Sequence, residues 1–337
     1  MNGPLYHSEV MMLHPSIVVC QTLSSHLLER LETYFDVHYF PQEKDRQSEH
    51  YRLAAASAQG LVASGGFTLG SQQLALFPKL VAVSTISVGF DSYDVDVLSA
   101  AGIVLCHTPG VLDETVADTV FALMLSSARR VVELADWVKT GQWQGKLPAS
   151  LFGLDVHHKT LGIVGLGRIG MAVARRAHHG FGMSILYAGR HANPEAEQQF
   201  AAQQVALAEL MQRSDFVVLL VPLTEQTYHL IDYPLLSQMQ PSAILINAAR
   251  GDVVNEQALI DVLQQGMIAG AGLDVFHQEP LPKNSPLLQL PQVVAVPHIG
   301  SATEQTRQAM ATLAVDNLIA ALHERRLQNC VNPSAIA

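Results

Sequence analysis

A short apolar run that leads into a glycine-rich turn constrains this chain more than any other feature. The run TLGIV (residues 160–164) precedes GLGRIG (165–170), and the Ala-rich pattern of a helix follows. In such a unit the first glycine permits the tight turn, the second lets a pyrophosphate approach the backbone, and the third lets the helix pack on the strand. The pattern predicts a dinucleotide-binding unit. Its expected phosphate-side residues are Gly165, Gly167, Arg168, Ile169 and Gly170.

The end of the next predicted strand indicates which dinucleotide binds. A site for NAD usually has an acidic residue there, which binds the ribose 2′-hydroxyl. This strand instead ends YAGRH (187–191), and Arg190 can make a forked, charge-assisted contact with a 2′-phosphate. We therefore expect NADPH as the preferred cofactor, with NADH also possible. The alternative is that Arg190 is only a solvated surface residue.

Three charged side chains follow the ends of three later strands. Arg250 lies in INAARG (246–251), Glu279 lies shortly after GLDVF (272–276), and His298 follows VP (296–297). Ligands of open parallel sheets bind at the carboxyl ends of strands. An arginine can hold a substrate carboxylate and polarise a carbonyl, and a histidine held protonated by a carboxylate can protonate a developing alkoxide. This set predicts a reductase of 2-oxo acids.

Short β-branched runs alternate with helical patterns along the whole chain, which indicates parallel sheets built from βαβ units. The strands expected before a break at Thr108-Pro109-Gly110 are 16–22, 60–64, 81–87 and 103–108. Those expected after it are 160–165, 184–188, 215–222, 243–248, 270–276 and 293–297. The predicted fold is α/β, with two Rossmann-like or flavodoxin-like, doubly wound parallel sheets and a cleft between them. The longest helical pattern runs from Leu112 to about Thr140.

Composition excludes several classes of function. The 337 residues are 49% hydrophobic, with a formal net charge of -10 and no basic cluster larger than Arg325-Arg326. We therefore expect no nucleic acid partner, and no apolar run reaches the roughly 20 residues that a membrane span needs. Three scattered cysteines form no CxxC pair, so we expect a reducing, cytoplasmic location and no metal site. The first ten residues do not resemble a signal peptide, and translation is expected to start at Met11 or Met12.

Four separated motifs in one order, GIVGLGRIG, ILINAARGDVVNE, AGLDVFHQEP and VPHIGSAT, resemble the D-isomer-specific 2-hydroxyacid dehydrogenases. The likeness extends from about Pro15 to Pro333, and details such as VPLTEQTYHL and NCVNP resemble more narrowly the bacterial glyoxylate/hydroxypyruvate reductases of this family, which also reduce 2-ketogluconate. Family members with the strand end LYxxR tend to prefer NADPH, in agreement with the expectation for Arg190. The resemblance implies that Arg250, Glu279 and His298 are catalytic, with His298 the proton donor. It also implies cofactor contacts from the residues that follow two later strands, Ala248 and Asp274, the latter to the nicotinamide carboxamide.

The resemblance further implies a discontinuous architecture. Residues 1–107 and 299–337 would form the substrate-binding domain, whose Val88 and Gly89 amides receive the substrate carboxylate, and residues 108–298 the cofactor domain. Closure of the cleft would bring His298 to the substrate carbonyl. Family members dimerise through the cofactor domain, so we expect a homodimer. SATE (301–304) reads as a capping box for the returning helix.

Two loops depart from the narrower pattern. Gly65 and Gly66 are expected to serve a tight turn, or else to enlarge the substrate pocket. The stretch KLPASLF (146–152) lacks the tryptophan that some relatives have in this region, and Trp143 is expected to be a packing anchor after the long helix.

The leading expectation is therefore NADPH-dependent reduction of glyoxylate, hydroxypyruvate or 2-ketogluconate to the (R)-2-hydroxy acid. Another dehydrogenase of the family, with a different 2-oxo acid and NADH, is the first alternative. A dinucleotide-sensing binding protein on the same scaffold is the second.

Overall fold

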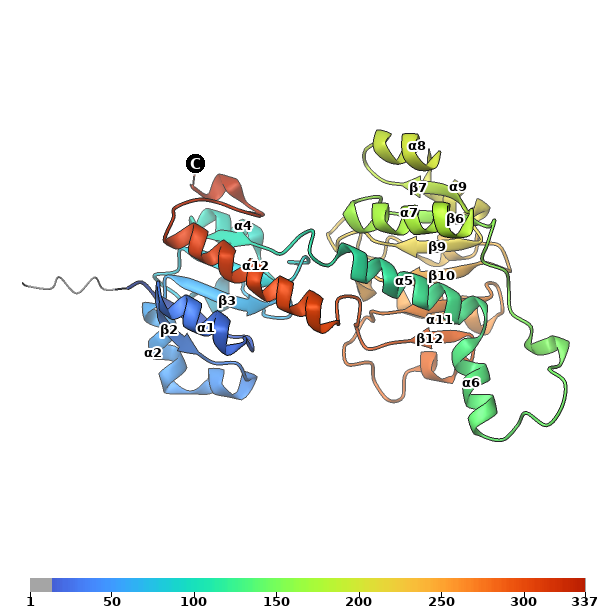
Figure 1. The fold of residues 1–337 in the computed structure, drawn as a ribbon, viewed down its shortest axis with the longest axis horizontal. Helices are drawn as coiled ribbons and strands as arrows, with labels where there is room; N and C mark the ends of the chain where they lie inside the picture. The colour runs from blue at the N-terminus through green and yellow to red at the C-terminus, as the bar shows by residue number, and fades with distance from the viewer. Residues whose placement is uncertain (1–13, 337) are drawn as a thin grey trace, which may run out of the picture. The chain divides into compact units, whose positions relative to one another are not determined.

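The computed structural model describes residues 14–336 and divides the chain into two compact units (Figure 1). The first contains the chain up to Pro109 together with the part from Gln308 onward, and the second contains Gly110–Arg307. Each unit holds one parallel sheet, as the alternating strand and helix patterns predict. The expected start at Met11 or Met12 lies outside the described residues.

The sheet of the first unit has five parallel strands in the order β2-β1-β3-β4-β5. The strands are β1 (Ser16–Val19), β2 (Asp36–Tyr39), β3 (Gly60–Ser64), β4 (Ala82–Ile86) and β5 (Val104–Cys106). The helices of this part are α1 (Ser25–Glu32), α2 (Glu49–Ser57), α3 (Ser71–Leu74), α4 (Val95–Ala100) and most of α12 (Glu304–Leu322). The sequence predicted four strands and missed β2, because this edge strand is only partly buried and its residues DVHY form no apolar run.

The sheet of the second unit has seven parallel strands in the order β12-β11-β10-β9-β6-β7-β8. The strands are β6 (Thr160–Val164), β7 (Ser184–Ala188), β8 (Gln203–Gln204), β9 (Phe216–Leu219), β10 (Ile244–Asn247), β11 (Gly270–Leu273) and β12 (Val293–Ala295). The two-residue β8, exposed at the edge, is the strand that the sequence missed. The order reverses beside β6, so the glycine-rich turn lies at the topological switch point, where such sheets bind ligands.

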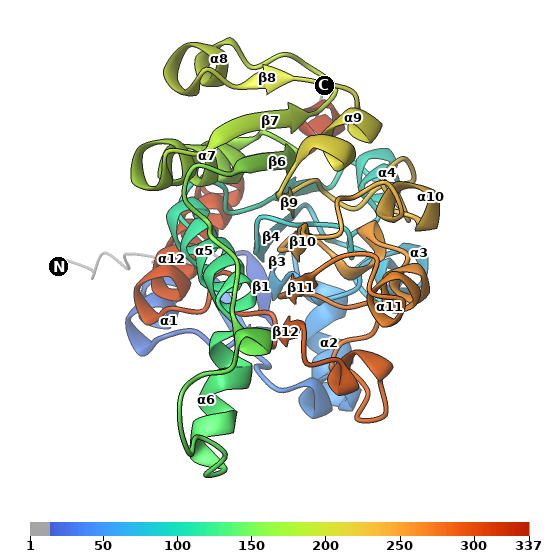
Figure 2. The same cartoon turned by 90° about the vertical axis from the view of Figure 1, so that its right-hand side faces the viewer.

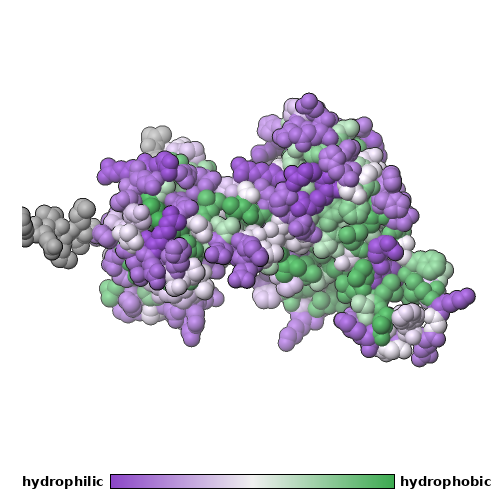
Figure 3. All heavy atoms as spheres, in the orientation of Figure 1, coloured by the Kyte–Doolittle hydropathy of each residue, from purple (hydrophilic) through white to green (hydrophobic). Residues whose placement is uncertain are grey.

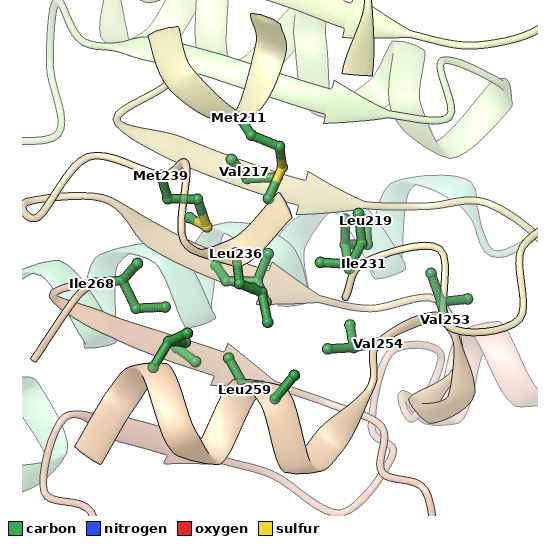
Figure 4. Packing of buried hydrophobic residues seen from close by; sticks show 14 of the residues in the cluster. Met211, Val217, Leu219, Ile231, Leu236, Met239, Val253, Val254, Leu259 and Ile268 are labelled. Carbon is green, nitrogen blue, oxygen red and sulfur yellow. The ribbon is translucent and has the colours of Figure 1, made fainter. Parts of the chain in front are cut away.

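Alternate residues of the buried strands enter two cores, one on each face of this sheet. Phe216 and Val218 pack among the side chains of α5 (Asp113–Ala128), α7 (Arg168–Phe181) and α8 (Pro194–Phe200). Val217 and Leu219 pack with α9 (Leu207–Arg213), α10 (Tyr233–Leu236) and α11 (Glu256–Gln264), as Figure 4 shows. Helices cover both faces of the sheet, so nearly every residue of the central strands is apolar.

The single long helix expected from Leu112 to about Thr140 is wrong. The chain forms α5 and then α6 (Val131–Lys139), and Arg130 between them has a left-handed φ of 53°. The Arg130 guanidinium bonds both carboxylate oxygens of Glu133 at 2.7 Å and the carbonyl of Ser150 at 2.6 Å. These contacts, made with the start of α6 and with a later loop, stabilise a break that the helical pattern does not reveal. Figure 2 shows α6 leaving the line of α5.

The return of the chain to the first unit also differs from the prediction. The expected boundary was residue 298/299, but residues 299–307 belong with the second unit, since Asp274 accepts hydrogen bonds from the amides of Ile299 and Gly300. The expected capping box at Ser301 is wrong as well: the amide of Thr306 donates to Oγ1 of Thr303, which precedes α12. Among the described residues, none of the helices combines the length and the apolar character that a bilayer crossing requires.

Candidate active site

His298 and Glu279 form a hydrogen-bonded pair, as their positions in the sequence predicted. Nδ1 of His298 lies 2.7 Å from Oε2 of Glu279, and Oε1 of Glu279 accepts a hydrogen bond from the amide of Phe276 at 3.1 Å. Burial by itself would raise the pKa of Glu279, but the hydrogen bonds from His298 and Phe276 outweigh it and lower this pKa. The carboxylate therefore stays ionised beside an imidazole whose ring is 47% exposed and open to a ligand.

Asp274 holds the turn that carries His298. Its carboxylate is 2% exposed, and its two oxygens accept hydrogen bonds from the amides of Ile299 at 2.6 Å and Gly300 at 2.8 Å. The amide of His298 itself donates to the carbonyl of Asp274 at 3.0 Å. Burial raises the pKa of Asp274, and the two amide bonds oppose that rise. Because His298 has a left-handed φ of 51°, these contacts compensate a backbone conformation that a non-glycine residue rarely adopts.

Arg250 follows β10 and is oriented by Asn247, a residue that the sequence reasoning missed. The buried Asn247 side chain accepts a hydrogen bond from the amide of Ala249 at 3.1 Å and donates one to the carbonyl of Arg250 at 3.0 Å. Nη1 of Arg250 donates to the carbonyl of Ala249 at 2.8 Å. Its positive charge also lowers the pKa of Glu279, so Arg250 interacts electrostatically with the carboxylate that is bound to His298.

The loops after β10 and β11 contact each other directly, through interactions that the sequence did not indicate. A Cβ atom on Gly251 would lie 1.9 Å from the carbonyl carbon of Phe276. Nδ1 of His277 lies 2.5 Å from Oδ1 of Asp252, and the amide of His277 donates to Glu256 at 3.0 Å. The Asp252 hydrogen bond raises the pKa of His277. The loop that carries Glu279 is thereby fixed against the loop that carries Arg250.

The glycine-rich turn has the shape that a bound pyrophosphate requires. Gly165 has φ of 98°, and a Cβ on Gly170 would lie 2.7 Å from the carbonyl oxygen of Gly165, so the helix and turn are in close contact. Gly167 precedes α7, and no atom lies within 4 Å of a Cβ placed on it. Open space therefore adjoins the amino end of a helix of 14 residues, where backbone amides attract phosphate. Arg168 and Ile169 begin this helix.

Arg190 is exposed just after β7, and hydrogen bonds fix the loop that follows it. Asn193, also missed by the sequence reasoning, donates to the carbonyl of Leu166 at 3.1 Å and accepts from the amide of Ala196 at 3.0 Å. The hydroxyl of Tyr187 accepts from the amide of Asn193 at 2.9 Å. Asn193 thus ties the glycine-rich turn to the loop that presents Arg190.

Val88 and Gly89 belong to the first unit, in a turn that is held by side chains. The amide of Gly89 donates to Oγ of Ser87 at 3.2 Å, and Nδ1 of His107 lies 2.9 Å from the carbonyl oxygen of Val88. A Cβ on Gly65 would lie 2.7 Å from Oγ of Ser87. Gly65 does not have a positive φ, so it serves this close approach and not a left-handed turn.

One further expectation concerns Trp143. The Trp143 ring is 62% exposed and is not a packing anchor within this chain. No group of three or more His, Cys, Asp or Glu side chains in residues 14–336 is arranged to hold a metal ion.

Known proteins are similar to this chain over most of its length. A family model described as the NAD binding domain of D-isomer specific 2-hydroxyacid dehydrogenases matches residues 121–300. Glyoxylate/hydroxypyruvate reductase B of Serratia proteamaculans is 53% identical over 324 residues, covering 96% of this chain and 99% of the relative. The protein of the same name from Yersinia enterocolitica is 55% identical, with the same coverage. An NADPH-dependent glyoxylate/hydroxypyruvate reductase from Sinorhizobium meliloti, solved with NADP and malonate, has a TM-score of 0.84 at 35% identity, covering 96% of this chain and 98% of that one.

Proposed function

Because the chain belongs to the D-isomer-specific 2-hydroxyacid dehydrogenase family, we propose that it reduces small 2-oxo acids to (R)-2-hydroxy acids with NADPH. It is an oxidoreductase that uses a nicotinamide dinucleotide. Glyoxylate and hydroxypyruvate are the proposed substrates, since the relatives are named for them, and 2-ketogluconate is a further candidate. The observation that carries the proposal is the ionised Glu279 carboxylate bound to the imidazole of His298, with Arg250 close enough to act on the same charge.

The proposed roles follow from the chemistry of these groups. Arg250 holds the substrate carboxylate and polarises the carbonyl, because its guanidinium is a fixed positive charge with several donors. His298 donates a proton to the oxygen of the carbonyl as negative charge develops there, and Glu279 stabilises the protonated imidazole before that transfer. The nicotinamide, when bound, supplies the hydride. Val88 and Gly89 are proposed to bind the substrate carboxylate through backbone amides.

The proposed cofactor site combines the open glycine-rich turn with the exposed Arg190. The pyrophosphate would lie at Gly165, Gly167 and Gly170, where no Cβ blocks the amino end of α7. Arg190 would bind the 2′-phosphate of NADPH, and NADH would bind more weakly because it lacks this charge. The four remaining proposed cofactor contacts are Arg168, Ile169, Ala248 and Asp274. Since both Asp274 oxygens already accept backbone amides, a carboxamide would share this carboxylate with them.

A homodimer through the second unit is also proposed. Val131, Val132 and Val138 of α6 are each about half exposed, and Trp143 and Phe152 of the following segment are more than 60% exposed. Figure 3 shows hydrophobic surface in this region. Exposed apolar surface of this kind is typical of an interface between protein chains. A second copy of the chain is the proposed occupant, which would also give Trp143 a packing partner.

The deciding experiment is a panel of 2-oxo acids assayed with NADPH and with NADH. We expect oxidation of NADPH with glyoxylate and hydroxypyruvate, and His298→Ala is expected to lower kcat by about 100-fold or more. His26→Ala, in α1, is the control and is expected to retain activity. A protein that binds NADPH but oxidises it with no 2-oxo acid would contradict the proposal and favour the dinucleotide-sensing alternative.

A further inference from the structure

Two cysteines of the first unit face each other where the C-terminal segment runs beside β5. Cys106 is the last residue of β5, and Cys330 forms an antiparallel bridge with it. The amide of His107 donates to the carbonyl of Asn329 at 3.1 Å. On the other side of the pair, the amide of Val331 donates to the carbonyl of Leu105 at 2.8 Å. This pattern makes the cysteines a non-hydrogen-bonded antiparallel pair, whose Cα atoms come to about 4.5 Å.

That spacing falls within the range that a disulfide requires, roughly 4.4 to 6.8 Å between Cα atoms. Both thiols are free, and the nearby Cys330 contributes to the raised pKa of Cys106. The register is fixed by Asn332, whose side chain accepts from the amide of Leu105 at 2.8 Å and donates to the carbonyl of Ile103 at 2.9 Å. The backbone register therefore gives the two cysteines a separation that a disulfide can span.

We propose that Cys106 and Cys330 are a modification site, at which hydrogen peroxide oxidises the two thiols to a disulfide that a thiol reductant reopens. Cys330 is partly exposed, whereas Cys106 is 1% exposed, so the peroxide reacts first at Cys330. The third cysteine, Cys20, is fully buried and has no such partner among the described cysteines.

The oxidation proceeds in two balanced steps. The deprotonated sulfur of Cys330 attacks one oxygen of the peroxide, the O–O bond breaks, and the departing hydroxide takes up a proton to become water, leaving a sulfenic acid. The sulfur of Cys106 then forms the S–S bond as the S–O bond breaks, and the hydroxide leaves with the Cys106 proton as a second water. One peroxide is reduced and two thiols are oxidised. Burial raises the pKa of Cys106 to about 12 and that of Cys330 above its usual value, so the reaction is expected to be slow.

The pair adjoins a hydrogen-bond network within the same unit. The carbonyl of His107 accepts from Asn317 at 2.8 Å, and Asn329 donates to the other end of the Asn317 amide at 2.9 Å. The ring of His107 in turn holds the carbonyl of Val88. A disulfide next to His107 therefore constrains the strand end that orients the Ser87–Gly89 turn.

The test uses the full-length reduced protein, treated with hydrogen peroxide, then alkylated in denaturant and digested without reductant. We expect one cross-linked peptide pair containing Cys106 and Cys330, a mass loss of about 2 Da, and loss of two of the three titratable thiols. Dithiothreitol should restore both thiols, and Cys20 should remain alkylated. The proposal is overturned if Cys106 and Cys330 are both still alkylated after prolonged treatment with excess hydrogen peroxide, or if Cys330 is found only as sulfinic acid.

Isosteric variants test the order of the two steps. In Cys106→Ser, dimedone should trap a sulfenic acid at position 330, whereas in Cys330→Ser the thiol of Cys106 should resist the same peroxide dose. Cys20→Ser is the matched control and should keep the cross-link. Oxidation of Cys106 at an unchanged rate in Cys330→Ser would contradict the assigned order of attack, and loss of the cross-link in Cys20→Ser would contradict the pair itself.

Discussion

A Cβ atom on Gly251 would lie 1.9 Å from the carbonyl carbon of Phe276, so the backbones that follow β10 and β11 are in direct contact. Gly251 directly follows Arg250, and Phe276 donates its amide hydrogen bond to Glu279. The relative position of the guanidinium and the carboxylate therefore depends on the absence of a side chain at one residue. The conformation does not need a positive φ at Gly251, so the requirement is steric.

Gly251→Ala is expected to destabilise the protein by about 1 to 3 kcal/mol, because the added methyl forces the two loops apart. It should lower kcat/KM by about 100-fold, since small displacements of catalytic groups have effects of this size. Gly180→Ala in α7 is the control: its Cβ meets no atom within 4 Å, and alanine should stabilise the helix by about 0.5 to 1 kcal/mol. Unchanged kcat/KM in Gly251→Ala would show that the loops are not coupled.

Arg190→Ala is expected to reduce the preference for NADPH over NADH by about 10- to 150-fold, the equivalent of a charged hydrogen bond of about 1.5 to 3 kcal/mol. The measurement is the ratio of kcat/KM for the two cofactors at one ionic strength. Arg213→Ala, which removes another exposed arginine from the same unit, is the matched control and should leave the ratio unchanged. If Arg190→Ala also leaves it unchanged, the 2′-phosphate assignment is wrong.

Glu279→Gln is expected to lower kcat for reduction by about 100-fold, because the amide does not supply a negative charge beside the imidazole of His298. The pKa of Glu279 is lowered in the folded protein. Its ionised form therefore contributes stability above its unfolded pKa, and this contribution is lost as pH falls through the lower folded value. Steady-state assays with glyoxylate measure this effect, and a variant that keeps the wild-type kcat would contradict the proposed role.

His277→Gln is expected to reduce the free energy of unfolding more at about pH 6 than at about pH 9. The hydrogen bond to Asp252 raises the pKa of His277. The protonated ring therefore stabilises the fold fully below the pKa of the unfolded state, and this stabilisation is lost as pH rises through the higher pKa of the folded state. Because the ring is 60% exposed, the effect should stay below about 1 kcal/mol. Urea unfolding at the two pH values measures this difference, with His26→Gln as the control. An equal loss of unfolding free energy at both pH values would contradict an ion pair between His277 and Asp252.

Val131→Asp combined with Val138→Asp is expected to convert a dimer into a single 36.5 kDa chain in light scattering, because two charges would be buried at the proposed interface. Leu53→Asp is the control, since Leu53 is 65% exposed on α2 of the other unit and should leave the mass unchanged. A wild-type protein that already has the mass of one chain would refute the dimer.

Much of the fold was predictable because most strands are buried on both faces and therefore appear as apolar runs. The predicted strand 60–64 coincides with β3 and 184–188 with β7. The edge strands β2 and β8 escaped prediction because they bury little surface and their residues carry no pattern. The break at Arg130 escaped it because the hydrogen bonds to Glu133 and to Ser150 come partly from a distant loop.

The candidate site was predictable to a similar degree. Glu279 and His298 were expected to meet, and they are hydrogen-bonded. Asn247 and Asn193 were not expected, because an asparagine that bonds backbone groups has no characteristic spacing in the sequence.

The amino-acid sequence alone determined the α/β class, the family and the residue types that can do the chemistry, because these depend on local periodicity and on side chains following strand ends. Only the tertiary structure decided that Asp274 holds the turn of His298, that His277 closes on Asp252, and that Cys106 faces Cys330. Each of these contacts joins residues distant along the chain. Their distances depend on strand register and loop packing, which no short stretch of sequence specifies.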